Sequence, residues 1–227
     1  MAMLPELGVA VLASIIAITL HEAAHGYAAD ALGDPTAREH GRISLNPLRH
    51  VDTTGTLLVP GFLLLVQALT IGRVEAMFGW AKPVPVDVRR LRNPRWGMMW
   101  VAAAGPAMNL ALAFTAALAA HLGGLLDADS EQMFYRAVAL FMVVNLVLAA
   151  FNLLPIPPLD GGRIVTALLP HGLAMRFAAL ERFGLFIVLG LILLPQLSPR
   201  LDVMAWITRH VVGPAFLFLL RAAGHPA

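Results

Sequence analysis

The sequence predicts an all-α polytopic membrane protein. Hydrophobic residues make up 59% of the 227-residue chain and charged residues only 13%, against roughly 45–50% and about 25% in soluble domains. Long apolar stretches recur along the chain, each bounded by polar or turn-forming residues. The net charge of +2 indicates charge asymmetry across a bilayer and no nucleic-acid partner. The absence of cysteine leaves His, Asp and Glu as the available metal ligands.

The first apolar stretch, residues 5–32, is long enough to cross a bilayer with some tilt. It lacks the basic start of a signal peptide, so we expect a retained helix. This helix carries His21, Glu22 and His25. Helical positions i and i+4 lie one above the other, so both imidazoles can face one metal ion. Ionisable groups in an apolar helix are costly, which indicates a functional site.

The region before the second long stretch is expected to enter the membrane without crossing it. The apolar residues 56–71 are interrupted by Pro60 and Gly61 and are short for a span, which favours a re-entrant segment. Residues 74–88, with prolines at 83 and 85, predict short extended strands. We therefore expect a short membrane-associated β-hairpin here.

Four later stretches predict the remaining spans: residues 96–122, 133–154, 177–194 and 203–220. With residues 5–32 they give about five transmembrane helices. Prolines and glycines between residues 155 and 163 forbid a regular helix, and such a break at membrane depth must be buried in protein or line a wet cavity.

Asp160 lies in this break and is the expected third metal ligand, since three protein ligands plus water are usual for catalytic zinc. For His21 and Asp160 to reach one ion, the helices 5–32 and 133–154 must run in the same direction. Helix 96–122 then runs oppositely, so the chain between the first two spans begins and ends on one side.

Charge supports this topology, because basic residues concentrate on the cytosolic side of membrane proteins. Three of the 16 basic residues, Arg136, Arg200 and Arg209, are expected on the other side. The metal side, which we therefore expect to be cytosolic with the N-terminus outside the cell membrane, collects the rest: Arg38, Arg42, Arg49, Arg73, Lys82, Arg89, Arg90, Arg92, Arg95, Arg163, Arg176, Arg182 and Arg221.

Three motifs resemble the site-2 protease family of intramembrane zinc metalloproteases. They are HEAAH at residues 21–25, GPAMN at 105–109 and NLLPIPPLDGG at 152–162. The loop pieces SLNPLRHVDTTGTLLVPG and FGWAKPVPVD look like its compact prokaryotic branch, which lacks a PDZ domain. The resemblance implies one domain, residues 1–227, with a catalytic core at about 5–165 and two C-terminal helices at 177–222.

The resemblance also implies one zinc ion per chain, held by His21, His25 and Asp160, with Glu22 as the general base. Its substrates would be single-span membrane proteins, cleaved in or near their transmembrane segments. Asn109 and Asn152 are candidates for binding the substrate backbone or a developing oxyanion; the alternative is an interhelical hydrogen bond. The stretch 74–86 could pair with unwound substrate as an added strand or with itself.

Two other functions compete with proteolysis. Ionisable residues within a membrane also line the pathways of divalent-metal transporters, although the chain shows neither the internal repeat nor the mid-bilayer site of that class. An inactive scaffold that binds membrane helices is the second alternative. The sequence leaves the oligomeric state open.

Overall fold

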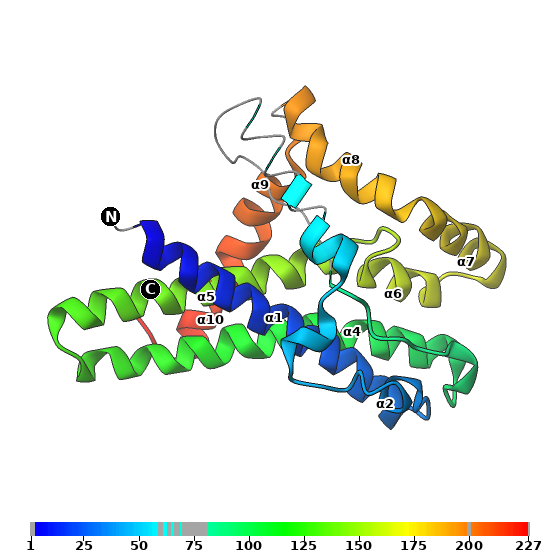
Figure 1. Cartoon of the computed structure of the whole chain (residues 1–227), viewed down its shortest axis with the longest axis horizontal. Coiled ribbons are helices and arrows are strands. Elements are labelled where there is room, and N and C mark those ends of the chain that lie inside the picture. Colours follow the sequence, from blue (N-terminus) through cyan, green and yellow to red (C-terminus); the bar gives the residue numbers. More distant parts are fainter. Residues whose placement is uncertain are drawn as a thin grey trace.

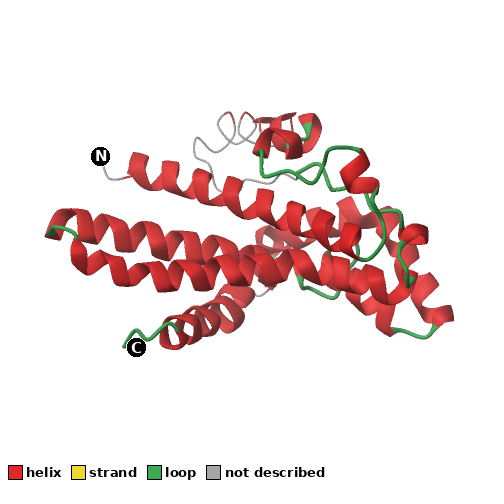
Figure 2. Cartoon of the chain, turned by 90° about the horizontal axis from the view of Figure 1, so that it is seen from below, coloured by secondary structure: helices red, strands yellow, loops and turns green. Residues whose placement is uncertain are grey.

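The computed structural model of the chain describes residues 3–58, 61–62, 65, 69, 81–198 and 201–226. These residues form helices joined by loops, and no strand occurs among them (Figure 2). Most of the predicted re-entrant segment and of the predicted β-hairpin lies outside the described residues. The described part of the hairpin region, residues 81–87, is extended but unpaired, so the hairpin is not supported.

Long helices form the body of the molecule (Figure 1). They are α1 (Met3–Ala31), α4 (Pro94–Ala119), α5 (Ala128–Asn152) and the consecutive α9 (Val203–Ile207), η7 (Thr208–Val212) and α10 (Gly213–Ala222). Shorter helices surround one end or connect the long ones: α2 (Thr36–Glu39), η1 (Pro47–His50), η2 (Thr53–Leu58), η3 (Val88–Arg90), η4 (Ala120–Leu125), α6 (Asp160–Leu168), α7 (His171–Ala178), η5 (Ala179–Phe183) and α8 (Gly184–Leu197).

Side-chain caps define where the central helices begin. The Asn93 side chain accepts a hydrogen bond from the Trp96 N–H, and Pro94 follows it at the first helical position of α4. Asp127 accepts from the Ser130 N–H at the start of α5. Such caps satisfy backbone donors that have no partner within the helix, and proline loses nothing at the first position because its missing N–H is not needed there.

Small residues bring α1, α4 and α5 close together. Ala17 on α1 and both Ala113 and Ala117 on α4 are fully buried, and Ala149 on α5 is 1% exposed. Apolar side chains gain little from leaving lipid, so membrane helices associate through close backbone approach at small residues. This close approach lets side chains from α1 and α4 meet inside the bundle.

Four helices are long and apolar enough to cross a membrane: Glu6–Ala31, Pro94–Leu125, Ala128–Asn152 and Val203–Ala222. The predicted fifth span, residues 177–194, is not one continuous helix. It is divided among the end of α7, the 3-10 helix η5 and α8, which begins only at Gly184. The described residues therefore support four spans, and the predicted count of five is not supported.

Both chain ends lie at the same end of the bundle as the α4–α5 connection (Figures 1 and 2). Glu6 lies 3.3 Å from Arg136 near the start of α5. The C-terminal tail is fixed by hydrogen bonds from His121 to the Ala223 carbonyl, 2.7 Å, and from His225 to the Ala117 carbonyl, 2.8 Å. The last span therefore runs parallel to α4. Placing Arg221 on the metal side was wrong, because an even number of spans returns the chain to its starting side.

This arrangement predicts the labelling pattern of single cysteines, which the chain naturally lacks. We expect Asp129→Cys and Pro226→Cys, both at exposed positions, to react with an impermeant maleimide from the same side of the membrane. Arg176→Cys, on the exposed α7 at the opposite end, should react only from the other side. Labelling of the cysteines at 226 and 176 from one side would restore the five-span topology.

Candidate metal centre

Three side chains converge inside the bundle. His21 Nε2 and His25 Nε2 lie 3.0 Å apart, and Asp160 Oδ2 lies 3.2 Å from the first and 3.4 Å from the second. A tetrahedral zinc site with metal–ligand distances of about 2.0–2.1 Å has ligand–ligand edges of about 3.3–3.4 Å. All three residues are buried, with exposures of 5%, 8% and 6%. The triangle therefore has the size that one tetrahedral ion requires.

Hydrogen bonds to α4 determine which ring nitrogens are available. His25 Nδ1 lies 2.7 Å from the Val101 carbonyl oxygen, and His21 Nδ1 lies 2.6 Å from Asn109 Oδ1. Both oxygens accept, so each Nδ1 carries the proton and each Nε2 presents a lone pair. Among the described residues, Asp160 Oδ2 is buried without a hydrogen-bond donor. Two lone pairs and a carboxylate facing one another at this distance repel unless a cation lies between them, so the donor set fits a zinc ion.

Glycines allow the aspartate to reach the histidines. A Cβ at Gly161 would lie 2.3 Å from the carbonyl oxygens of Leu153 and Leu154, and one at Gly162 would lie 2.6 Å from the Ile156 carbonyl carbon. The chain after α5 therefore folds tightly against the first turn of α6, where Asp160 is the first residue. The two glycines after Asp160 are needed for this close backbone contact.

Gly105 provides the opposite wall of the site. A Cβ built there would lie 2.5 Å from His25 Nε2 and 2.6 Å from His21 Nε2. One helical turn later, Asn109 accepts the proton of His21 Nδ1. The GPAMN motif thus contributes two features. Gly105 has no side chain that would collide with the imidazoles, and Asn109 supplies the acceptor that orients His21.

The amide of Asn109 is fully engaged. It is 0% exposed, and its Nδ2 donates to the Ala17 carbonyl at 3.2 Å and to Asn145 Oδ1 at 2.9 Å. Binding to a substrate backbone would require breaking one of these bonds. Asn152 is bonded more simply, since its Nδ2 donates to the Leu148 carbonyl of its own helix.

Glu22 lies next to the first histidine but outside the group of three ligands. Its Oε2 accepts a hydrogen bond of 2.9 Å from the Val84 N–H. Sequence reasoning missed Val84 and the Val101 carbonyl, because backbone groups leave no trace in residue identity. Asn145 did carry a signal, as an amide in a largely apolar span.

A cavity of about 550 Å³ adjoins the site. Val84, which bonds Glu22, and Gly162, two residues after Asp160, both line it. Its remaining walls come from the start of α4, the loop before α6, and the helices α6 and α7, and they include Met98, Pro157, Pro158, Ala167 and Ala174. The lining is largely apolar, with Arg163 and Glu181 among its charged residues.

Gly105→Ala is expected to abolish metal binding while leaving the fold intact. Alanine suits a helix interior better than glycine by roughly 0.5–1 kcal/mol. Its methyl group, however, would collide with two imidazoles that are held in place by their Nδ1 hydrogen bonds. Zinc per chain should fall from about one toward zero by elemental analysis. Gly190→Ala, a helical position with open space around it, serves as the control. Full zinc occupancy in Gly105→Ala would contradict the site geometry.

Asn109→Leu should weaken zinc binding without abolishing it. Loss of the hydrogen bond that orients a ligating histidine typically costs about 10–100-fold in affinity. Competition with a chromophoric chelator measures this change, and Asn152→Leu, which removes no bond to a histidine, should leave the affinity unchanged. Equal affinities of the Asn109→Leu variant and the unmodified protein would show that the Nδ1 bond does not orient His21.

Comparison with known proteins agrees with this geometry. The sequence model of Peptidase family M50 matches residues 121–194. "Putative zinc metalloprotease YwhC" of Bacillus subtilis is 37% identical over 193 residues, covering 82% of this chain and 80% of that protein. "Putative zinc metalloprotease Rip2" of Mycolicibacterium smegmatis is 26% identical, covering 81% of this chain and 66% of its own length. No solved structure matches the chain. The chain therefore belongs to Peptidase family M50, the site-2 proteases, and is a zinc metalloendopeptidase with several apolar membrane helices.

Proposed function

We propose that the chain hydrolyses peptide bonds in or near transmembrane segments of single-span membrane proteins. The observation that carries this proposal is the position of the metal ligands within membrane-length helices. His21 lies 15 residues after Glu6 in the span Glu6–Ala31, or about 22 Å along a helix that rises 1.5 Å per residue. A substrate must therefore reach the site at membrane depth.

The roles of the residues follow from their positions. His21, His25 and Asp160 would hold the ion, and Glu22 is the proposed general base. Zinc, when bound, supplies a Lewis acid that polarises the scissile carbonyl and acidifies water. Glu22 Oε2 accepts a hydrogen bond from the Val84 N–H. The other oxygen, Oε1, is the one proposed to take a proton from water and to return it to the leaving amine.

The substrate must present an unwound peptide bond, because a transmembrane helix satisfies all its backbone groups internally. The 550 Å³ cavity lined by Val84 and Gly162 is of the size and largely apolar character that accepts small molecules and apolar side chains. We propose that it receives side chains of the unwound segment. Asn152 is the amide proposed to contact the substrate backbone, since its single bond to Leu148 can be released by rotation.

Charge supports an orientation in the cell membrane with the site toward the cytosol and the N-terminus outside. Arg136, which pairs with Glu6, and Arg221, at the start of the tail that is bonded to α4, belong to the end that carries both termini. Arg209 lies within the last span. The other described basic residues lie on or next to α2, η1, η3, the start of α4, α6, α7 and η5, which hydrogen bonds join at the opposite end: Arg38, Arg42, Arg49, Lys82, Arg89, Arg90, Arg92, Arg95, Arg163, Arg176 and Arg182. By the positive-inside rule, this excess of basic residues supports a cytosolic position for this end.

Glu22→Gln should retain zinc and lose proteolysis. The amide keeps the size of the side chain but cannot accept the proton, so kcat should fall by at least about 100-fold, within the range of general acid–base catalysis. The assay is cleavage of a single-span peptide by the purified protein in detergent, with zinc quantified on the same sample. A zinc chelator should abolish the activity of the unmodified protein.

Glu39→Gln is the matched control, since Glu39 is exposed and pairs with Arg90 at 2.9 Å away from the ligands. It should cleave at the unmodified rate. Undiminished cleavage by Glu22→Gln would remove Glu22 from the mechanism, and cleavage that survives chelation would remove the metal.

A further inference from the structure

Residues 81–87 form an extended segment, here called the strap, that runs over the part of α1 carrying Glu22. It has no regular secondary structure. Backbone groups near both of its ends are nevertheless hydrogen-bonded to buried residues of other segments, and one at its centre is bonded to the half-buried Glu22. An extended segment with no partner strand would ordinarily be mobile, so these contacts require an explanation.

The first end is held by a buried arginine and by a backbone bond. Arg42 is only 9% exposed and donates from Nη2 to the Lys82 carbonyl at 2.6 Å. The Lys82 N–H donates to the carbonyl of His50 at 2.8 Å. Burial of a guanidinium costs several kcal/mol unless it is hydrogen-bonded, so Arg42 has a strong preference for this position of the strap.

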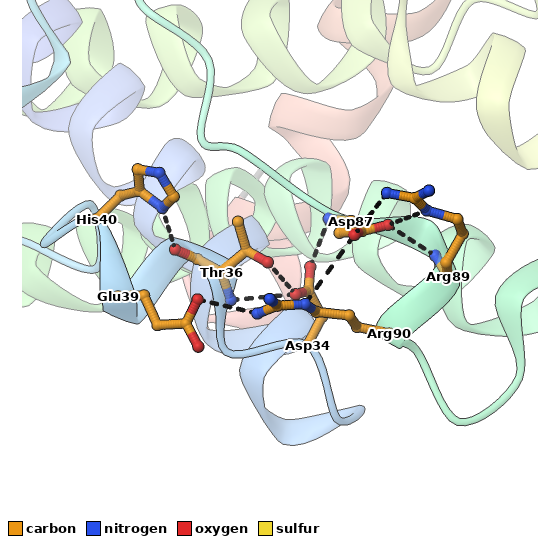
Figure 3. Close-up of polar contacts among 7 residues, drawn as sticks. All are labelled: Asp34, Thr36, Glu39, His40, Asp87, Arg89 and Arg90. Atoms are coloured by element: carbon orange, nitrogen blue, oxygen red, sulfur yellow. Dashed lines mark hydrogen bonds and ion pairs between the residues drawn. The ribbon is translucent and has the colours of Figure 1, made fainter.

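The second end is held by Asp34, which is 0% exposed (Figure 3). One carboxylate oxygen accepts from the Thr36 N–H and hydroxyl, and the other accepts from the Asp87 N–H at 2.7 Å. Asp87 in turn accepts from Arg89, and this contact lowers the pKa of the Asp87 carboxyl. The strap thus ends in a network of charged groups that fixes its position along α1.

Between these ends the strap directs one backbone donor at the base. Pro83 and Pro85 have no N–H, and the Val86 N–H has no hydrogen-bond partner among the described residues. The Val84 N–H, in a residue only 8% exposed, donates to Glu22 Oε2 at 2.9 Å. The prolines on either side hold the backbone extended at this point without offering a competing donor.

We infer that the strap positions the catalytic base: the Val84 N–H fixes the Glu22 carboxylate so that one oxygen remains for the proton of water. The inference rests on the proposed function. Glutamate has three side-chain torsions, and a base that must be found in one orientation loses rate in proportion to the time spent in others. A backbone donor fixed at both ends of its segment restricts that motion without occupying the second oxygen.

Val84→Pro tests this positioning role, because it deletes the N–H while keeping an extended backbone that suits a proline-rich segment. We expect kcat to fall about tenfold or more, which is part of the roughly 10²–10⁴-fold that general acid–base catalysis contributes, with KM within about twofold and zinc content unchanged. Val86→Pro is the matched control, because it adds proline to the same strap where no N–H bond is lost. It should retain most of kcat.

A second readout does not depend on cleavage. The carboxylate stretch of Glu22, isolated as the infrared difference between the unmodified protein and Glu22→Gln, should shift in Val84→Pro and stay in place in Val86→Pro. If Val84→Pro does not fold, Arg42→Gln is the alternative variant. It removes the bond that holds the first end of the strap at Lys82, and it should lower kcat while zinc is retained.

Two results would overturn the inference. One is a kcat of Val84→Pro equal to that of Val86→Pro with an unshifted carboxylate band. The other is a kcat above that of the unmodified protein, which would make the contact inhibitory. Absence of cleavage by the unmodified protein would refute the proposed function instead, and the infrared band would still decide whether the strap holds Glu22.

Discussion

The site depends on two hydrogen bonds that α4 accepts from α1. The Val101 carbonyl and Asn109 Oδ1 take the Nδ1 protons of His25 and His21, and only then do both Nε2 lone pairs face the same point. The bonds require backbones in close contact, which the buried alanines of α1 and α4 permit. The packing of small residues therefore allows the Nδ1 hydrogen bonds, and these bonds determine both the tautomer of each histidine and the direction of its Nε2 lone pair. A larger side chain at Gly105 would displace both imidazoles and so disrupt this arrangement.

The third ligand comes from a place where regular structure has to stop. The chain leaves α5 at Asn152, turns through a proline-rich loop and begins α6 at Asp160. Gly161 and Gly162 bring this turn within van der Waals contact of the preceding carbonyls. A carboxylate at the first position of a short helix is also favoured by the helix dipole. The break thus serves as the means by which an acidic side chain reaches a buried pair of imidazoles, and it adjoins the cavity proposed for the substrate.

Residue identity predicted the part of the site made by side chains. His21, His25 and Asp160 were expected to meet, and the structure brings the Asp160 Oδ2 within 3.4 Å of both Nε2 atoms. The position of Asn109 on the helix was expected, but its engagement by His21, Ala17 and Asn145 depends on the rotation of α4 against its neighbours. The strap contacts Glu22 through a backbone N–H. Any residue except proline has this group, so residue identity does not predict the contact.

The topology was predicted less well. The common direction of α1 and α5 follows from shared ligation and agrees with the structure. The last span was assigned the wrong direction, because hydropathy does not show that residues 177–194 divide into shorter helices. What corrected it was the contact between the C-terminal tail and the end of α4, through His121 and His225.

The central claim is that His21, His25 and Asp160 hold one zinc ion, and X-ray absorption at the zinc edge of the purified protein tests it most directly. We expect one zinc per chain in a first shell of four nitrogen or oxygen atoms at about 2.0–2.1 Å, with the multiple-scattering signature of two imidazoles. Asp160→Ala should remove one oxygen or the ion itself. A shell with no imidazole, or a spectrum unchanged by Asp160→Ala, would contradict the claim.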